Sequence, residues 1–107
     1  MNEIDVRTFI SWQREGRDFI LLDVREKQEY VISNIGGRLV PLSVISSHID
    51  NLPRDKTLVF HCRSGKRSAV AIRFLLDRGF EKRFLYNLKG GIEAYVRETQ
   101  DTEGNLD

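Results

Sequence analysis

The only cysteine of the chain stands among basic residues and a glycine, in the stretch HCRSGKRS (residues 61–68). Cys62 follows an apolar, strand-like run and precedes a helix-like segment, so it is expected to lie under the free N–H groups of a helix N-terminus. Gly65 permits a loop in which successive N–H groups point inward. The cations of this loop are Arg63, Lys66 and Arg67. Such surroundings lower the pKa of a thiol from about 8.5 into a range of roughly 3.5 to 7.5, so the pattern indicates a nucleophilic thiolate.

The alternative for Cys62 is an inert core residue, since free cysteines are often buried. Three cations and a glycine in the five residues after it are poor neighbours for a core position, so the reactive interpretation is favoured. His61 precedes the cysteine, but adjacent residues of a strand point to opposite faces. We therefore predict that His61 is a hydrogen-bonded residue at the end of a strand. Without a convergent base, protease-like chemistry has little support.

Apolar runs alternate with amphipathic segments along the whole chain. The continuous apolar run at 19–24 is typical of a strand buried on both faces. Alternating strands and helices predict a parallel sheet with helices on both faces, and ligands bind such sheets beyond the carboxyl ends of the strands. This rule places Asp23 and Arg25 beside Cys62. The predicted strands lie near Ile4 and at 19–24, 57–61 and 83–88, with a short one before Pro41. The predicted helices start after Asp5 and at 26–33, 43–52, 68–80 and 92–99.

Length and composition fit one ordinary domain. The chain has 107 residues, 40% hydrophobic and 31% charged, with a formal net charge of +1. We predict a single domain over residues 1–98 and a polar, acidic tail over 99–107 that frays. The small net charge argues against nucleic-acid and membrane-surface partners, and no apolar run approaches the ~18–20 residues of a membrane span. One cysteine and two histidines cannot build a zinc cage, and a lone thiol fits the reducing cytoplasm.

Five segments of the chain carry a resemblance to a known family: LLDVREKQEY (21–30), NIGGRLVPL (34–42), LVFHCRSGKRSA (58–69), LLDRGF (75–80) and LYNLKGGIEAY (85–95). Together and in this order, they make the chain similar to the rhodanese family of sulfurtransferases. The resemblance runs from about the first predicted helix to GGIEAY and is specific because the parts occur together. It departs from the family at Ser33–Gly37, where a Gly-His-Ile-Pro-Gly turn is usual, and at Tyr95, where a tryptophan is usual.

The resemblance implies a three-layer α/β/α fold around a mainly parallel, five-stranded sheet. It implies that Cys62 carries sulfur as a persulfide and that Asp23 anchors Arg63 of the loop, while Arg25 faces the pocket. In the family pattern a cysteine and five further residues form the loop that binds substrate and stabilises the persulfide. Those residues here are Arg63, Ser64, Gly65, Lys66 and Arg67, without a gap.

The implied reaction moves a sulfane sulfur from a donor such as thiosulfate to cyanide, a small thiol or a protein thiol. The loop cations are expected to attract the anionic donor, with Lys66 and Arg67 on its sulfonate oxygens. The family implies no metal and no organic cofactor. Because the chain has no second cysteine, the sulfur must leave on another molecule.

Two alternatives remain open. Cysteine-dependent phosphatases, and arsenate reductases like them, place five residues between their cysteine and arginine, whereas only four separate Cys62 from Arg67. The shorter loop suits one sulfur atom better than a tetrahedral phosphate. The other alternative is a rhodanese-like delivery or binding module that acts with a partner protein, because two segments resemble modules attached to enzymes that activate ubiquitin-like carriers. Those segments are NIGGRLVPL and LKGGIEAYVRE.

Overall fold

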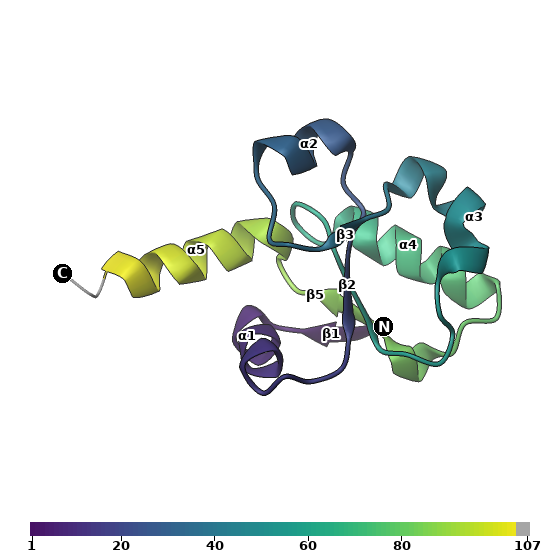
Figure 1. The fold of residues 1–107 in the computed structure, drawn as a ribbon, viewed down its shortest axis with the longest axis horizontal. Helices are drawn as coiled ribbons and strands as arrows, with labels where there is room; N and C mark the ends of the chain where they lie inside the picture. The colour runs from purple at the N-terminus through teal and green to yellow at the C-terminus, as the bar shows by residue number, and fades with distance from the viewer. Residues whose placement is uncertain (105–107) are drawn as a thin grey trace.

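Five parallel strands form the centre of the structure, a computed structural model that describes the backbone of residues 1–104 and the side chains of residues 1–100 (Figure 1). The order across the sheet is β1-β5-β4-β2-β3, and every neighbouring pair is parallel. The strand that precedes the cysteine, β4, is therefore central. The strands are β1 (Asn2–Ile4), β2 (Ile20–Asp23), β3 (Arg38–Leu39), β4 (Leu58–His61) and β5 (Leu85–Leu88).

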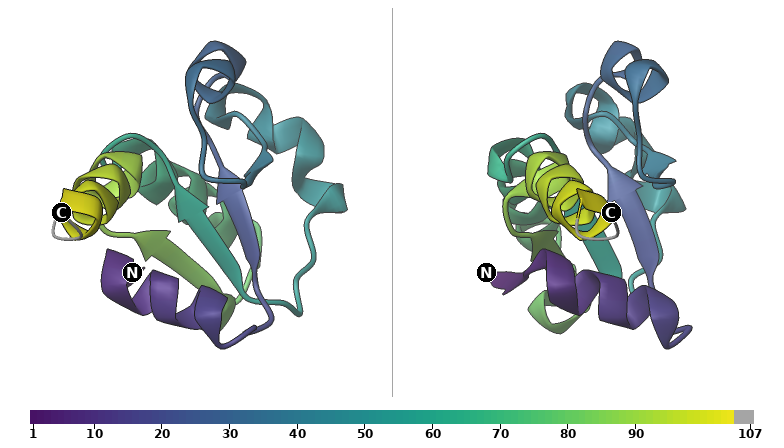
Figure 2. Two further views of the ribbon diagram at one scale, coloured as in Figure 1. Left: turned by 60° about the vertical axis from the view of Figure 1, so that its left-hand side comes forward. Right: turned by 90° about the vertical axis from the view of Figure 1, so that its left-hand side faces the viewer.

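Helices cover both faces of the sheet, as predicted (Figure 2). One face is covered by α1 and α5, and the other by α3 and α4. The short α2 has no buried residue and lies beyond the carboxyl end of β2 (Figure 1). The predicted three-layer fold with a five-stranded parallel sheet is confirmed. The helices are α1 (Val6–Arg14), α2 (Lys27–Ile32), α3 (Ile45–His48), α4 (Lys66–Asp77) and α5 (Gly91–Gly104).

The central strand β4 is buried along its whole length, because its side chains enter a separate hydrophobic cluster on each face. Leu58 and Phe60 point toward α3 and α4, and Cys62 continues their alternation on that face. Val59 points toward α1 and α5. The alternation of a strand therefore separates His61 from the sulfur of Cys62, as the sequence predicted.

The predicted start of the first helix is confirmed, but the predicted helix at 43–52 is not continuous. Asp5 caps α1 by accepting a hydrogen bond from the Thr8 N–H at 2.8 Å. The segment 43–52 holds only the four-residue α3 between 3-10 turns, and the Ser47 hydroxyl bonds back to the Val44 carbonyl, which favours bending over a continuous helix.

The length of α5 also differs from its prediction, and α4 has one exposed apolar residue. Val70 of α4 is 48% exposed, because Ala71, Ile72 and Leu75 take the inward face of this helix. Helix α5 continues to Gly104, past the predicted end at 99. The predicted fraying of residues 105–107 lies outside the described residues. No helix within residues 1–104 is long and apolar enough to cross a membrane.

Candidate active site

Cys62 directly follows β4, at the carboxyl edge of the sheet where the topology predicts a site. Its side chain is 1% exposed. The chain then turns through three residues and enters α4, and Gly65 caps this helix with a φ of +106°. A residue with a side chain rarely adopts this conformation, so the glycine allows the sharp entry. The predicted position of Cys62 below a helix N-terminus is confirmed.

Several groups of the loop and of α4 surround the Cys62 sulfur. The Gly65 N–H donates to Sγ at 3.1 Å and the Ser68 N–H at 3.4 Å, while the Ser68 hydroxyl also lies at 3.4 Å. Burial by itself would raise the pKa of the Cys62 thiol. The hydrogen bonds from Ser68, Gly65 and the Ser64 backbone outweigh burial and hold this pKa below its ordinary value. The site thus favours the thiolate.

Ser68 and Asn87 extend this network, and sequence reasoning missed both. The Ser68 hydroxyl donates to Asn87 Oδ1 at 2.6 Å, and Asn87 Nδ2 donates to the Gly65 carbonyl at 3.0 Å. Asn87 therefore joins β5 to the loop and to the first turn of α4. A signal was present, because an asparagine inside the apolar strand LYNL is buried and must find partners.

Removing the Ser68 hydroxyl should raise the pKa of Cys62. This hydroxyl has one proton, which Asn87 binds at the shorter distance and for which a thiolate at Cys62 competes. We expect that the alkylation rate of Cys62 by iodoacetamide falls as pH drops through the thiol pKa, and that Ser68→Ala moves this midpoint upward. The backbone N–H donors remain, so the shift is partial. Ser68→Thr, which keeps a hydroxyl, is the control, and an equal midpoint in wild type and Ser68→Ala would contradict the role of the hydroxyl.

Asp23 binds Arg25 instead of the loop arginine. The Asp23 carboxylate accepts from Arg25 Nη2 at 2.8 Å, from Arg25 Nε at 3.0 Å and from the Arg25 backbone N–H at 3.0 Å. Arg25 also donates to the Ser33 carbonyl at 2.8 Å, at the turn that departs from the family pattern. The expected anchoring of Arg63 by Asp23 is therefore wrong. Residues two apart in an extended segment share a side, so Asp23 meets its own neighbour first.

His61 is fully buried beside this pair. Its Nε2 lies 3.5 Å from Asp23 Oδ2 without a hydrogen bond, and its Nδ1 lies 3.4 Å from the Cys62 carbonyl oxygen. Burial lowers the pKa of His61 more than the nearby Asp23 carboxylate raises it, so the imidazole is neutral near pH 7. His61 contacts the backbone of Cys62 and not its sulfur, in agreement with the prediction.

Two of the three loop cations are engaged by glutamates. Arg67 forms a two-pronged ion pair with Glu29 of α2, at 2.6 and 2.9 Å, and this pair lowers the pKa of Glu29 to about 2. Arg63 Nε donates to Glu93 of α5 at 2.9 Å. Lys66 is exposed and has no partner among the side chains that the structure describes.

The N-terminus of α5 holds the backbone of the loop from the other side. The Ile92 N–H donates to the Cys62 carbonyl at 2.9 Å and the Glu93 N–H to the Arg63 carbonyl at 3.1 Å. Gly91, with a φ of +60°, lies against these two carbonyl groups, and a Cβ at this position would overlap both oxygens. A glycine at position 91 therefore lets α5 approach the loop.

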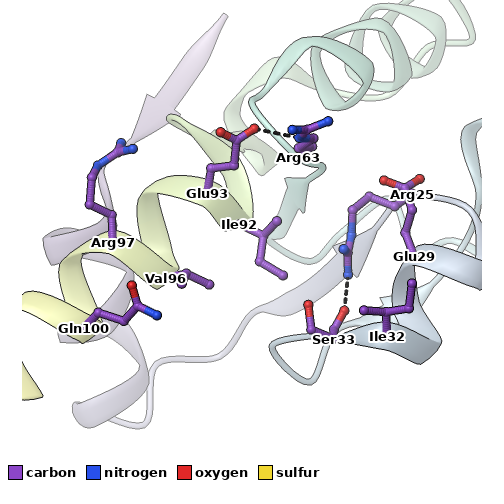
Figure 3. A pocket seen from close by; sticks show the side chains of 10 residues that line it. All are labelled: Arg25, Glu29, Ile32, Ser33, Arg63, Ile92, Glu93, Val96, Arg97 and Gln100. Carbon is purple, nitrogen blue, oxygen red and sulfur yellow. Dashed lines mark hydrogen bonds and ion pairs between the residues drawn. The ribbon is translucent and has the colours of Figure 1, made fainter.

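A pocket of about 510 Å³ opens beside the loop, between α2 and α5 (Figure 3). Arg63 of the loop and Arg25 both line this pocket, and the expected part of Arg25 in substrate binding stays a prediction. The described residues include no group of three or more His, Cys, Asp or Glu side chains arranged to bind a metal ion. The residues lining the pocket are Arg25, Glu29, Ile32, Ser33, Arg63, Ile92, Glu93, Val96, Arg97 and Gln100.

Comparison with known proteins gives consistent matches. The family model described as "Rhodanese-like domain" matches residues 5–98. A protein named "Sulfurtransferase" from Allochromatium vinosum is 33% identical over 98 residues, which cover 91% of this chain and 90% of that protein. Among solved structures, a rhodanese-related protein from Thermoplasma volcanium superimposes with a TM-score of 0.79 at 27% identity, covering 92% of this chain and 93% of that one.

A longer relative also contains a similar segment. The "Probable adenylyltransferase/sulfurtransferase MoeZ" of Mycobacterium tuberculosis is 37% identical over 100 residues, which cover 91% of this chain. The chain spans only 25% of the length of that protein. Similar segments therefore occur both as nearly whole proteins and as parts of larger ones whose names include sulfur transfer.

Proposed function

The chain belongs to the rhodanese-like domain family, and on this premise we propose that it is a sulfurtransferase that works through a persulfide on Cys62. Sulfurtransferase-named relatives at 33–37% identity support the reaction class. The observation that carries the proposal is the cradle of N–H and hydroxyl groups around one sulfur atom, which lowers the pKa of the thiol.

In the first half-reaction the Cys62 thiolate attacks the outer sulfur of a donor such as thiosulfate. A bond forms between Sγ and that sulfur, the sulfur–sulfur bond of the donor breaks, and its electron pair leaves with sulfite. The charge of the attacking thiolate thus ends on sulfite, while the outer sulfur keeps the negative charge that it carried in the donor and becomes the anionic end of the persulfide. The N–H groups of Gly65 and Ser68 stabilise the thiolate, and the first N–H groups of α4, which lack acceptors in their own helix, are available to the outer sulfur.

In the second half-reaction a thiophilic acceptor (cyanide, a small thiol or a protein thiol) attacks the outer sulfur and Cys62 leaves as a thiolate. Electrons and atoms balance within the two half-reactions, so the proposal requires no cofactor. Arg63 and Lys66 extend into solvent and give the mouth of the loop a positive potential, which attracts an anionic donor. Arg67 is less available than the sequence suggested, because Glu29 occupies its terminal nitrogens.

The structure of the loop also bears on the phosphatase alternative. Asp23, on the strand beside that of the cysteine, is buried and accepts hydrogen bonds from three donor groups of Arg25, so it is not free to protonate a leaving group. The proposal therefore keeps sulfur transfer as the function. Its proposed compartment is the cytoplasm, because a single cysteine thiol fits a reducing environment.

The test is incubation of the protein with thiosulfate, followed by mass spectrometry of the intact chain. We expect a mass gain of one sulfur atom and loss of the free Cys62 thiol in the wild type, and neither change in Cys62→Ser. In parallel, both proteins are incubated with para-nitrophenyl phosphate. Phosphate release by the wild type without sulfur uptake would overturn the proposal and support the phosphatase alternative.

A further inference from the structure

Arg67 is a cation of the Cys62 loop whose direct partner is Glu29. It lies on the first turn of α4, next to Ser68, whose N–H and hydroxyl contact the sulfur. Glu29 raises the pKa of Arg67 most, and the negative charges of Cys62 and Asp23 raise it further. Arg67 is therefore within electrostatic range of an anion at the sulfur, but a carboxylate already balances its charge.

The contact of Glu29 with Arg67 is the stronger of the two ion pairs at the loop. Both oxygens of Glu29 accept from the terminal nitrogens of Arg67, at 2.6 and 2.9 Å, and the side chains of Arg67 and Glu29 are 34% and 31% exposed. In the other pair, Arg63 and Glu93 share one hydrogen bond and are 74% and 49% exposed. Water and salt screen an exposed pair, whereas a two-pronged, partly buried pair keeps more of its strength. Glu29 is therefore the carboxylate with the larger effect on the loop.

The three cations of the loop do not leave a strong positive charge beside the sulfur. Glu29 and Glu93 contribute two carboxylates, and the thiolate of Cys62 contributes a third negative charge. The pKa of Glu29 is lowered to about 2 because Arg67 hydrogen-bonds to it, so this carboxylate is ionised throughout the neutral range. A donor with two negative charges therefore gains less from the loop than its cations alone would provide.

Glu29 also lies where its charge acts on the donor. It lines the pocket beside the loop together with Arg25 and Arg63 (Figure 3). Its Oε1 accepts a hydrogen bond from the Glu26 N–H at 3.1 Å, which caps α2. A glutamine can keep this capping hydrogen bond, because it has a side-chain oxygen at the same place. The charge of Glu29 can therefore be removed while the start of α2 is kept.

We propose that Glu29 is a specificity-determining residue, which makes the site select sulfur donors by their charge. The inference rests on the proposed sulfurtransferase function and concerns its first half-reaction. Glu29 balances Arg67, so the second negative charge of a dianionic donor meets a neutralised cation and a nearby carboxylate. A donor with a single negative charge is disfavoured less. With either donor a bond forms between Cys62 Sγ and the outer sulfur, the sulfur–sulfur bond of the donor breaks, and its electron pair leaves on sulfite or on a sulfinate.

The experiment compares two donors that differ by one charge. Thiosulfate has two negative charges and methanethiosulfonate has one, and both carry the transferable sulfur on an oxidised sulfur atom. Intact-mass analysis over time and donor concentration gives the second-order rate constant of Cys62 loading for each donor. We expect Glu29→Gln to raise the rate constant for thiosulfate about fivefold relative to that for methanethiosulfonate, which is the effect of one ion pair at a partly exposed site.

Two control variants and a salt series separate the charge of Glu29 from its structural role. Glu81→Gln removes a carboxylate that pairs with Arg83 at 2.8 Å, before β5 at the opposite edge of the sheet, and should leave both rate constants unaltered. Glu29→Asp keeps the charge and should keep the wild-type ratio of the two rate constants. The gain in Glu29→Gln should also shrink at high ionic strength, because salt screens the charge of the donor, whereas a change of loop structure would act at every salt concentration.

The possible failures are distinct. If neither donor loads Cys62 in the wild type, the proposed function fails. If both donors load but Glu29→Gln changes the two rate constants by the same factor, Glu29 does not select donors by charge and the proposed function stands. An equal change of the ratio in Glu81→Gln or in Glu29→Asp would overturn the inference in the same way.

Discussion

Replacing Gly91 by alanine is expected to abolish persulfide formation on Cys62. A Cβ at this position would overlap the Cys62 carbonyl oxygen and come within 2.5 Å of the Arg63 carbonyl oxygen. These two carbonyl groups accept the hydrogen bonds that tie the loop to α5, so the loop must move away. The N–H groups that surround the sulfur then lose their positions, and loss of a single such donor at an active site reduces a rate by about 10²–10³. The measurement is the rate of sulfur uptake from thiosulfate by intact-mass analysis.

A matched control separates this collision from the backbone cost. Gly16 has nearly the same φ as Gly91, +67° against +60°, but a Cβ there would meet no atom within 4 Å. Gly16→Ala therefore loses only the stability that the left-handed backbone conformation costs a residue with a Cβ, about 1–2 kcal/mol. This variant should load sulfur at the wild-type rate. Normal loading by Gly91→Ala would show that α5 does not position the loop.

Replacing Asp23 by alanine is expected to be the most destabilising single change at the site. It leaves the Arg25 guanidinium buried, with only the Ser33 carbonyl as acceptor among the contacts described above. Removing one partner of a buried ion pair costs about 3–5 kcal/mol, which is a large part of the 5–15 kcal/mol by which a typical domain is stable. Urea unfolding followed by circular dichroism measures the loss.

The double variant Asp23→Leu with Arg25→Met keeps this prediction testable if Asp23→Ala does not fold. Replacing both members of a buried pair by apolar residues of similar volume is often nearly neutral. We expect the double variant to regain most of the stability that either single substitution loses. If its loss instead equals the sum of the single losses, the ion pair is not the cause of the destabilisation.

The sequence predicted the parts of the site that are local. The order of strands and helices is sufficient to place Cys62 at the carboxyl end of a central strand, and the adjacent glycine and basic residues indicate the loop. The cradle of donors around the sulfur depends on more distant partners. Asn87 reaches Gly65 and Ser68 from 22 and 19 residues away, a pairing that no spacing pattern along the chain encodes.

Side-chain pairings were predicted less well than backbone positions. Resemblance to the family assigned Asp23 to Arg63, but the partner of an arginine depends on which carboxylate its flexible side chain meets in space. Arg63 meets Glu93 of α5, and Arg67 meets Glu29 of α2. A pocket beside the loop was expected, but its walls on α2 and α5 were not, because these helices are far apart in the sequence and only the fold brings them together.

The loop at Cys62 is held by two helix N-termini, that of α4 at Gly65 and that of α5 at Ile92, and by Asn87 of β5. Because these three supports belong to the folded core, the donors face the sulfur before any substrate arrives. The reorganisation energy of the reaction is consequently small, since the anionic outer sulfur of the persulfide replaces the anionic thiolate while the surrounding dipoles stay in place. The folded protein thus stabilises one anionic sulfur atom with N–H dipoles that are already fixed in place.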